Sequence, residues 1–178
     1  LNTVSTIGSS LTINNNNILS NLNGLNNVST IGGELYIYQN PSLTSLMGLN
    51  ALDTINGRIK VSNNNALTNL TGLDGVIFVG GDIAVNNNAV LTSLTGLNGV
   101  NSISGGLQIY ENSSLTSILA LNSISSINLL IIVNNGNLTN CDAQSICNYV
   151  SIVTNSVNIS GNATGCASSA EIQQECGN

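Results

Sequence analysis

The sequence contains no histidine and no tryptophan, and it has one proline, one phenylalanine and two basic residues in 178. Without histidine, neither a Ser/His/Asp triad nor a Cys/His pair can form, and imidazole metal sites are excluded. Two cations against eight acids give a formal charge of −6, which lacks the basic footprint that nucleic-acid binding needs. These absences predict a non-enzymatic protein with no metal, no cofactor and no nucleic-acid partner.

Long hydrophobic runs are lacking as well. Runs such as Leu129–Val133 are far too short to span a bilayer, so we expect no membrane insertion. Among the carboxylates, Glu34 and Asp82 share one repeat position with Arg58 between them. This pattern indicates an exposed charge ladder rather than a catalytic acid/base pair.

What the chain does have is a strict 24-residue repeat of the pattern L-x-I-x-x-N. Its first apolar position falls at Leu11, Leu35, Ile59, Ile83, Leu107 and Ile131. Its second falls at Ile13, Ile37, Val61, Val85, Ile109 and Val133. Its asparagine falls at Asn16, Asn40, Asn64, Asn88 and Asn112, and Gly136 breaks this series in the sixth repeat. A fixed period of roughly 20 to 50 residues is typical of stacked, quasi-one-dimensional folds.

The spacing within one repeat predicts the shape of each coil. Leu35 and Ile37 alternate as in a half-buried strand, whereas the later apolar residues recur every third position, too closely for an amphipathic α-helix. We therefore predict a mainly β fold, a right-handed parallel β-solenoid of 24-residue leucine-rich-type coils. The recurrent asparagines are predicted to be structural, since stacked inward amides satisfy the turn N–H and C=O groups.

All four cysteines fall in the C-terminal part of the chain, at Cys141, Cys147, Cys166 and Cys176. Their spacing lacks the C-x-x-C knuckle of a zinc site, so we predict disulfides, with three pairings left open. Disulfides together with scarce lysine indicate an extracellular location.

The segment around the cysteines is predicted to close the solenoid. DAQSICNYV has helical spacing, and Val157, Ile159 and Asn162 restore the repeat pattern as a seventh strand, 26 residues after the sixth. A capping box from Ser168 to Glu171 then starts a second helix that places Ile172 on the core. We thus divide the chain into a repeat solenoid, residues 1–136, and a cysteine-containing cap, 137–178, on the same core.

The first coil is incomplete, because Leu1, Val4 and Ile7 match the middle of the following coil. Solenoids need caps. We expect further coils or a capping segment before Leu1, or a partner docked on this open end.

The outward strand positions vary where the inward ones repeat. One column holds Thr12, Tyr36, Lys60, Ala84, Gln108 and Ile132, and the next holds Asn14, Tyr38, Ser62, Asn86, Tyr110 and Asn134. Tyrosines with polar neighbours suit a sugar or a polar protein loop. The candidate ligand-binding residues are therefore Tyr36, Tyr38, Lys60, Gln108 and Tyr110. Because tyrosine is favoured on exposed strands anyway, a purely structural role is the alternative.

The units LTSLxGLxxVxxIxGxLxIxxN resemble the receptor L domain-like leucine-rich repeats of secreted surface proteins of Bacteroidota, flavobacteria above all. NCDAQSICNYV, ISGNATGC and AEIQQEC are similar to the segment that closes such repeats. The resemblance implies export by the type IX secretion system. In that family a sorting domain usually follows the cap, and this sequence stops at Asn178. It also implies O-glycans on D-[ST]-aliphatic triplets, which makes Thr54 a candidate glycosylation site.

These observations predict an extracellular binding or adhesion module that recognises a glycan or a protein on its strand face. An alternative is a filament or stalk whose subunits, neighbouring copies of this chain, join end to end. A minor alternative is an ice-binding solenoid, based on the threonine column Thr44, Thr68, Thr92 and Thr116. Consecutive rather than alternate hydroxyl residues argue against a flat ice-binding face.

Overall fold

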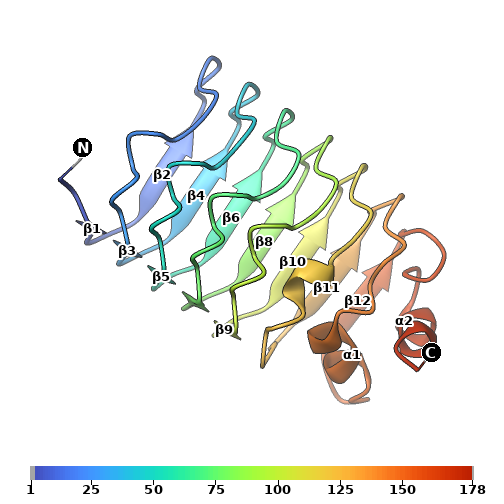
Figure 1. The fold of residues 1–178 in the computed structure, drawn as a ribbon. Helices are drawn as coiled ribbons and strands as arrows, with labels where there is room; N and C mark the ends of the chain where they lie inside the picture. The colour runs from blue at the N-terminus through green and yellow to red at the C-terminus, as the bar shows by residue number, and fades with distance from the viewer. Residues whose placement is uncertain (1–2, 178) are drawn as a thin grey trace.

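The computed structural model describes residues 3–177 and has the predicted architecture, a parallel β-solenoid (Figure 1). The main sheet contains β2 (Leu11–Asn14), β4 (Leu35–Tyr38), β6 (Ile59–Ser62), β8 (Ile83–Asn86), β10 (Leu107–Tyr110), β11 (Leu130–Val133) and β12 (Val157–Ser160), neighbours in that order. A second, narrow sheet contains β1 (Thr6–Ile7), β3 (Thr30–Ile31), β5 (Thr54–Ile55), β7 (Phe78–Val79) and β9 (Ser102–Ile103). Each coil contributes one strand to each sheet up to β10, and the coils stack side by side.

The core runs along the whole stack between these sheets and the connecting bends. In the repeat 35–58, all seven predicted inward residues are fully buried: Leu35, Ile37, Leu43, Leu46, Leu49, Leu52 and Ile55. Each such side chain contributes roughly 1.5 to 3 kcal/mol of burial free energy. Near the start, Val4 and Ile7 are only partly buried, and Leu1 lies outside the described residues.

The predicted asparagine ladder is present and continuous. The Asn64 Nδ2 donates to the carbonyls of Ile37, at 2.9 Å, and Ser62, at 3.1 Å. Its Oδ1 accepts from the backbone N–H of Asn40 at 3.2 Å. Asn40, Asn88 and Asn112 repeat these bonds. Each amide thus joins its own turn to the preceding coil.

The turn before each ladder position has a conformation that the repeat pattern did not predict. The preceding residue is left-handed in every coil, with φ of 56 to 57° at Asn15, Gln39, Asn63, Asn87, Glu111 and Asn134. Asparagine tolerates this conformation better than most residues. A different constraint applies at Gly72, with φ of 117°, where a Cβ atom would collide with the Leu46 carbonyl of the previous coil.

The sixth repeat differs from the sequence prediction by one residue. β11 pairs with β10 so that Leu130 lies opposite Leu107 and Ile132 opposite Ile109, and both are fully buried. The assignment of Ile131 and Val133 to inward positions was therefore wrong, and these two side chains face outward in place of Ile132 and Asn134. Asn135, not Gly136, continues the ladder and accepts from the Asn112 N–H at 3.1 Å.

A missing residue in the preceding bend causes this shift. The Asn128 N–H donates to the Gly105 carbonyl, and the Leu107 N–H donates to the Leu129 carbonyl. Coil six is therefore one residue short, between Ile127 and Asn128. Within residues 3–177 the narrow sheet ends at β9 and gains no strand from this coil. The deletion thus falls in a bend and leaves the ladder intact.

The C-terminal cap contains the predicted seventh strand, two helices and two disulfides. β12 pairs with β11, and Asn162, two residues after β12, extends the ladder. Asn162 comes 27 residues after Asn135, so the predicted interval of 26 was wrong because of the register shift. Helices α1 (Gln144–Val150) and α2 (Ser169–Glu175) follow coil six and β12, and a 3-10 turn, η1 (Leu119–Leu121), precedes them. Figure 1 shows both helices at the C-terminal end of the stack.

The disulfides join Cys141 to Cys166 and Cys147 to Cys176, which confirms disulfides over a zinc site. Cys141 occupies the inward position of a leucine and is buried, as predicted. The Ser168 Oγ accepts from Glu171 N at 3.2 Å, and Ile172 is buried. The Glu171 carboxylate does not complete the capping box; it accepts from the N–H groups of Gly165 and Ala167 instead.

No helix within residues 3–177 is long and apolar enough to cross a membrane.

We predict that Asn64→Ala lowers the free energy of unfolding by at least about 3 kcal/mol, because several buried backbone groups lose their partners. Denaturant unfolding would measure this loss. Asn65→Ala is the matched control, since Asn65 lies in the same turn but is exposed, and it should change stability by less than about 1 kcal/mol. Equal effects of the two substitutions would contradict the structural role of the ladder.

We also predict that a mild reductant opens Cys147–Cys176 before Cys141–Cys166. The first pair is partly exposed, whereas both cysteines of the second are buried, and a thiolate must reach a sulfur to attack it. Alkylation followed by peptide mass mapping would give the order. Loss of Cys147–Cys176 alone should cost about 3 kcal/mol of stability. Simultaneous reduction of both bonds would show that the cap opens as one unit.

Candidate binding site

The outward side of the main sheet, here called the strand face, presents two parallel rows of side chains. The strand register gives the first row as Thr12, Tyr36, Lys60, Ala84, Gln108, Ile131 and Asn158. The second row is Asn14, Tyr38, Ser62, Asn86, Tyr110, Val133 and Ser160. Neighbours within a row lie about 4.8 Å apart, the spacing of adjacent strands.

Three of the predicted ligand-binding residues gather in one hollow. Tyr36, Tyr38, Arg58 and Lys60 line a depression of about 260 Å³, here called the tyrosine–cation hollow. It contains both basic residues of the chain and two of its four tyrosines. Arg58 was predicted to belong to a charge ladder and not to this surface, although it directly precedes β6.

An ion pair and a hydrogen bond hold one side of the hollow. The Arg58 Nε lies 2.8 Å from the Glu34 Oε1, which is one half of the predicted charge ladder, whereas Asp82 accepts from the Gly106 N–H and the Gln108 Nε2 instead. A hydrogen bond from the Tyr36 hydroxyl, and then the Arg58 charge, hold the pKa of Glu34 below its ordinary value. The same hydrogen bond raises the pKa of Tyr36. Both tyrosine and arginine are therefore oriented by the carboxylate.

Lys60 differs from Arg58 in having no internal partner. Within residues 3–177 its ammonium group makes no hydrogen bond or ion pair. Tyr38 is fixed on the other side, since its hydroxyl accepts from the Asn14 Nδ2 at 2.9 Å. The hollow thus combines a cation that is available to a ligand with two positioned aromatic rings.

The other two predicted residues do not line this hollow. Gln108 and Tyr110 lie on β10, two strands beyond β6. The Gln108 Nε2 donates to the Asp82 Oδ2 at 3.3 Å. Tyr110 shares the second row with Tyr38, at three strand spacings or about 14 Å.

The threonine column has a structural use in the solenoid. The hydroxyls of Thr44, Thr92 and Thr116 each donate to a backbone carbonyl of the preceding coil, at 3.1 to 3.2 Å. In the neighbouring column, Ser93 accepts from a backbone N–H two residues later. Hydroxyls committed to these bonds are poorly suited to order ice, so the column itself favours a role in stacking the coils.

Thr54, the candidate glycosylation site, lies half-buried on β5 in the narrow sheet, next to the exposed Asp53. Its glycosylation stays a prediction.

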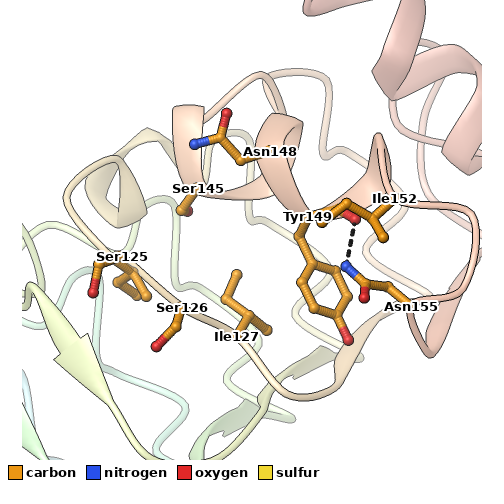
Figure 2. Close-up of a pocket in the computed structure, with 9 residues that line it drawn as sticks. Ser125, Ser126, Ile127, Ser145, Asn148, Tyr149, Ile152 and Asn155 are labelled. Atoms are coloured by element: carbon orange, nitrogen blue, oxygen red, sulfur yellow. Dashed lines mark hydrogen bonds between the residues drawn. The ribbon is translucent and has the colours of Figure 1, made fainter.

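A second hollow of about 260 Å³ lies between coil six and α1 (Figure 2). It opens where the narrow sheet ends, and Ile127, Tyr149 and Ile152 form much of its lining. Two of its polar groups serve the protein itself: Ser145 donates to Leu121 O, and Asn155 donates to Tyr149 O. Because this hollow also lacks a cation, the tyrosine–cation hollow is the stronger candidate for a charged ligand.

Comparisons with protein-family models, with curated proteins and with solved structures found no match for this chain. The fold alone therefore defines the class of this protein. It is a parallel β-solenoid of about six 24-residue turns with a disulfide-bonded C-terminal cap. The resemblance to receptor L domain-like repeats stays a prediction.

We predict that Glu34→Gln lowers the pKa of Tyr36 toward the ordinary value of tyrosine. The substitution removes the carboxylate that raises this pKa and leaves Arg58, whose charge lowers it. An NMR titration of the tyrosine rings at alkaline pH would follow the change. The control is Glu175→Gln, which alters an exposed carboxylate in α2. An unchanged Tyr36 titration would contradict the hydrogen bond to Glu34.

Proposed function

We propose that this protein is an extracellular, non-enzymatic binding or adhesion module that takes a glycan or protein ligand on its strand face. The observation that supports this most is the tyrosine–cation hollow, where both cations of a chain with net charge −6 meet two tyrosines. Inward positions repeat from coil to coil, whereas this surface does not. A purely structural sheet gives no reason for that concentration.

The chemistry of the hollow fits a polar ligand that carries negative charge. Tyrosine rings offer flat apolar faces with little conformational freedom to lose on binding, and their hydroxyls form hydrogen bonds. Lys60 offers a compact cation with three donors. Glu34 pairs with Arg58, and Asp82 is close enough to act on the Arg58 charge, so Lys60 is the cation that would attract such a ligand.

The scaffold favours binding by a preformed surface. The site residues lie on strands whose inward neighbours are fully buried, so little ordering entropy is lost when a ligand binds. The two disulfides support an oxidising compartment. A bacterial cell-surface location and type IX export rest on the resemblance of the repeat and cap motifs.

We predict that Lys60→Gln weakens binding of the preferred ligand by about tenfold or more, because one charge-assisted contact is lost. An array of glycans and peptides would identify a ligand, and calorimetry would give the affinity. Asn158→Asp is the matched control: it changes the net charge by the same amount on the same strand face, but on β12.

The outcomes of this experiment are distinct. Equal loss in Lys60→Gln and Asn158→Asp would indicate a general charge effect and would contradict a site at the hollow. Wild-type protein that binds neither glycans nor peptides would contradict the proposed function itself.

A further inference from the structure

The strand face contains a buried polar atom without a partner. The Asn86 Oδ1 makes no hydrogen bond within residues 3–177, and the Asn86 side chain is only 5% exposed. A buried acceptor without a partner is destabilising, and such atoms are rare in folded proteins. This atom lies on the outward side of β8, where nothing in the core requires an amide.

The repeat itself does not explain Asn86. The ladder asparagines, such as Asn88, use their amides fully on backbone groups. At the position of Asn86 five other coils carry a different residue, and Asn14, the other asparagine of this row, donates to the Tyr38 hydroxyl. The Asn86 carbonyl does serve the ladder, accepting from Asn88, but its side chain does not.

The position of Asn86 connects the two groups of predicted ligand-binding residues. In the second row, Tyr38, Ser62, Asn86 and Tyr110 come from four neighbouring strands. Ser62 and Asn86 are short and buried between the two tyrosines in this order. In the first row, Lys60 and Gln108 stand on either side of the short Ala84. The short side chains of the second row thus lie on β6 and β8, between Tyr38 and Tyr110.

Because the strands are about 4.8 Å apart, this row repeats at a distance close to that of successive rings in an extended oligosaccharide. An amide offers a donor and an acceptor in one plane, which suits neighbouring sugar hydroxyls. Because the Asn86 Oδ1 is itself buried, it meets a ligand only after rotation about the last side-chain bond, which exchanges the positions of the oxygen and the nitrogen without movement of the backbone.

We propose that Tyr38, Asn86 and Tyr110 bind the first, third and fourth rings of an acidic oligosaccharide whose carboxylate pairs with Lys60. This assignment rests on the proposed function and makes it specific. The tyrosines contact the ring faces, the Asn86 amide bonds ring hydroxyls, and the ligand supplies the partner that the Asn86 oxygen lacks in the free protein.

The test compares affinity with stability in Asn86→Leu, a substitution of similar size without polar atoms. Calorimetry with uronic-acid tetrasaccharides, their methyl esters and the free uronic acids would give affinities, and denaturant unfolding would give stability. We expect about tenfold weaker binding of the acidic tetrasaccharide, the factor for one hydrogen bond, together with unfolding at higher denaturant concentration. Wild-type protein should bind the methyl ester and the free uronic acid more weakly than the acidic tetrasaccharide.

Asn158→Leu is the matched control and should change neither quantity, since this exposed asparagine lies on β12. Asn86→Ala provides a second variant that introduces no bulk, with the same expected loss of affinity. If both Asn86 variants are more stable but bind the tetrasaccharide as wild type does, the proposal is overturned, and the proposed function stands. If another ligand binds and depends on Lys60 while no acidic tetrasaccharide binds, the ligand class is wrong and only this proposal fails. If no glycan or peptide binds at all, both fail.

Discussion

The solenoid depends on one recurring interaction, the buried asparagine amide that bridges two coils. Each coil turns sharply after its main-sheet strand, and within this turn the ladder asparagine is buried while the residues beside it, such as Asn63 and Asn65, are exposed. Asn64 meets the carbonyls of Ile37 and Ser62 and accepts from the N–H of Asn40. Without such an amide these groups would be buried unpaired, at a cost of roughly 1 to 3 kcal/mol each.

This interaction fixes the geometry of the repeat. Because each amide bonds the preceding coil, successive turns must superimpose, and the left-handed residue before each ladder asparagine keeps the same φ in all six turns. Changes of length are confined to other parts of the coil. Coil six loses its residue beside Ile127, and the cap inserts α1, yet Asn135 and Asn162 continue the ladder. The bends and the cap adjust, whereas the turn does not.

The sequence was sufficient for the features that depend on periodic burial. The solenoid, the inward residues of 35–58, the ladder and the position of Cys141 all follow from repeating positions. The register of coil six did not follow from the repeat, because Leu129–Val133 is apolar throughout and fits two registers equally well. A fixed period favoured Ile131, whereas the asparagine at position 135 was the signal for the correct register. Disulfide pairing requires distances between segments that spacing alone does not contain.

The candidate site was less predictable for a related reason. Tyr36, Tyr38 and Lys60 could be assigned to the strand face by alternation along β4 and β6. The contribution of Arg58 depends on where its long side chain turns after pairing with Glu34, and no periodic pattern encodes that. Asn86 could be placed in its column, but its missing hydrogen bond emerges only from the surrounding packing.

A fold with such consistent internal pairing makes its exceptions informative. Natural sequences satisfy local and global requirements together, and departures from this consistency concentrate where function imposes another requirement. The ladder amides of this protein are paired, and so are the hydroxyls of the threonine column. Against that background, an unpaired amide oxygen at Asn86 and an unpaired ammonium at Lys60 lie on the same face, on adjacent strands. Under the binding role that we propose, both groups would meet a polar partner outside the chain, held at a spacing that the stacking of the coils sets in advance.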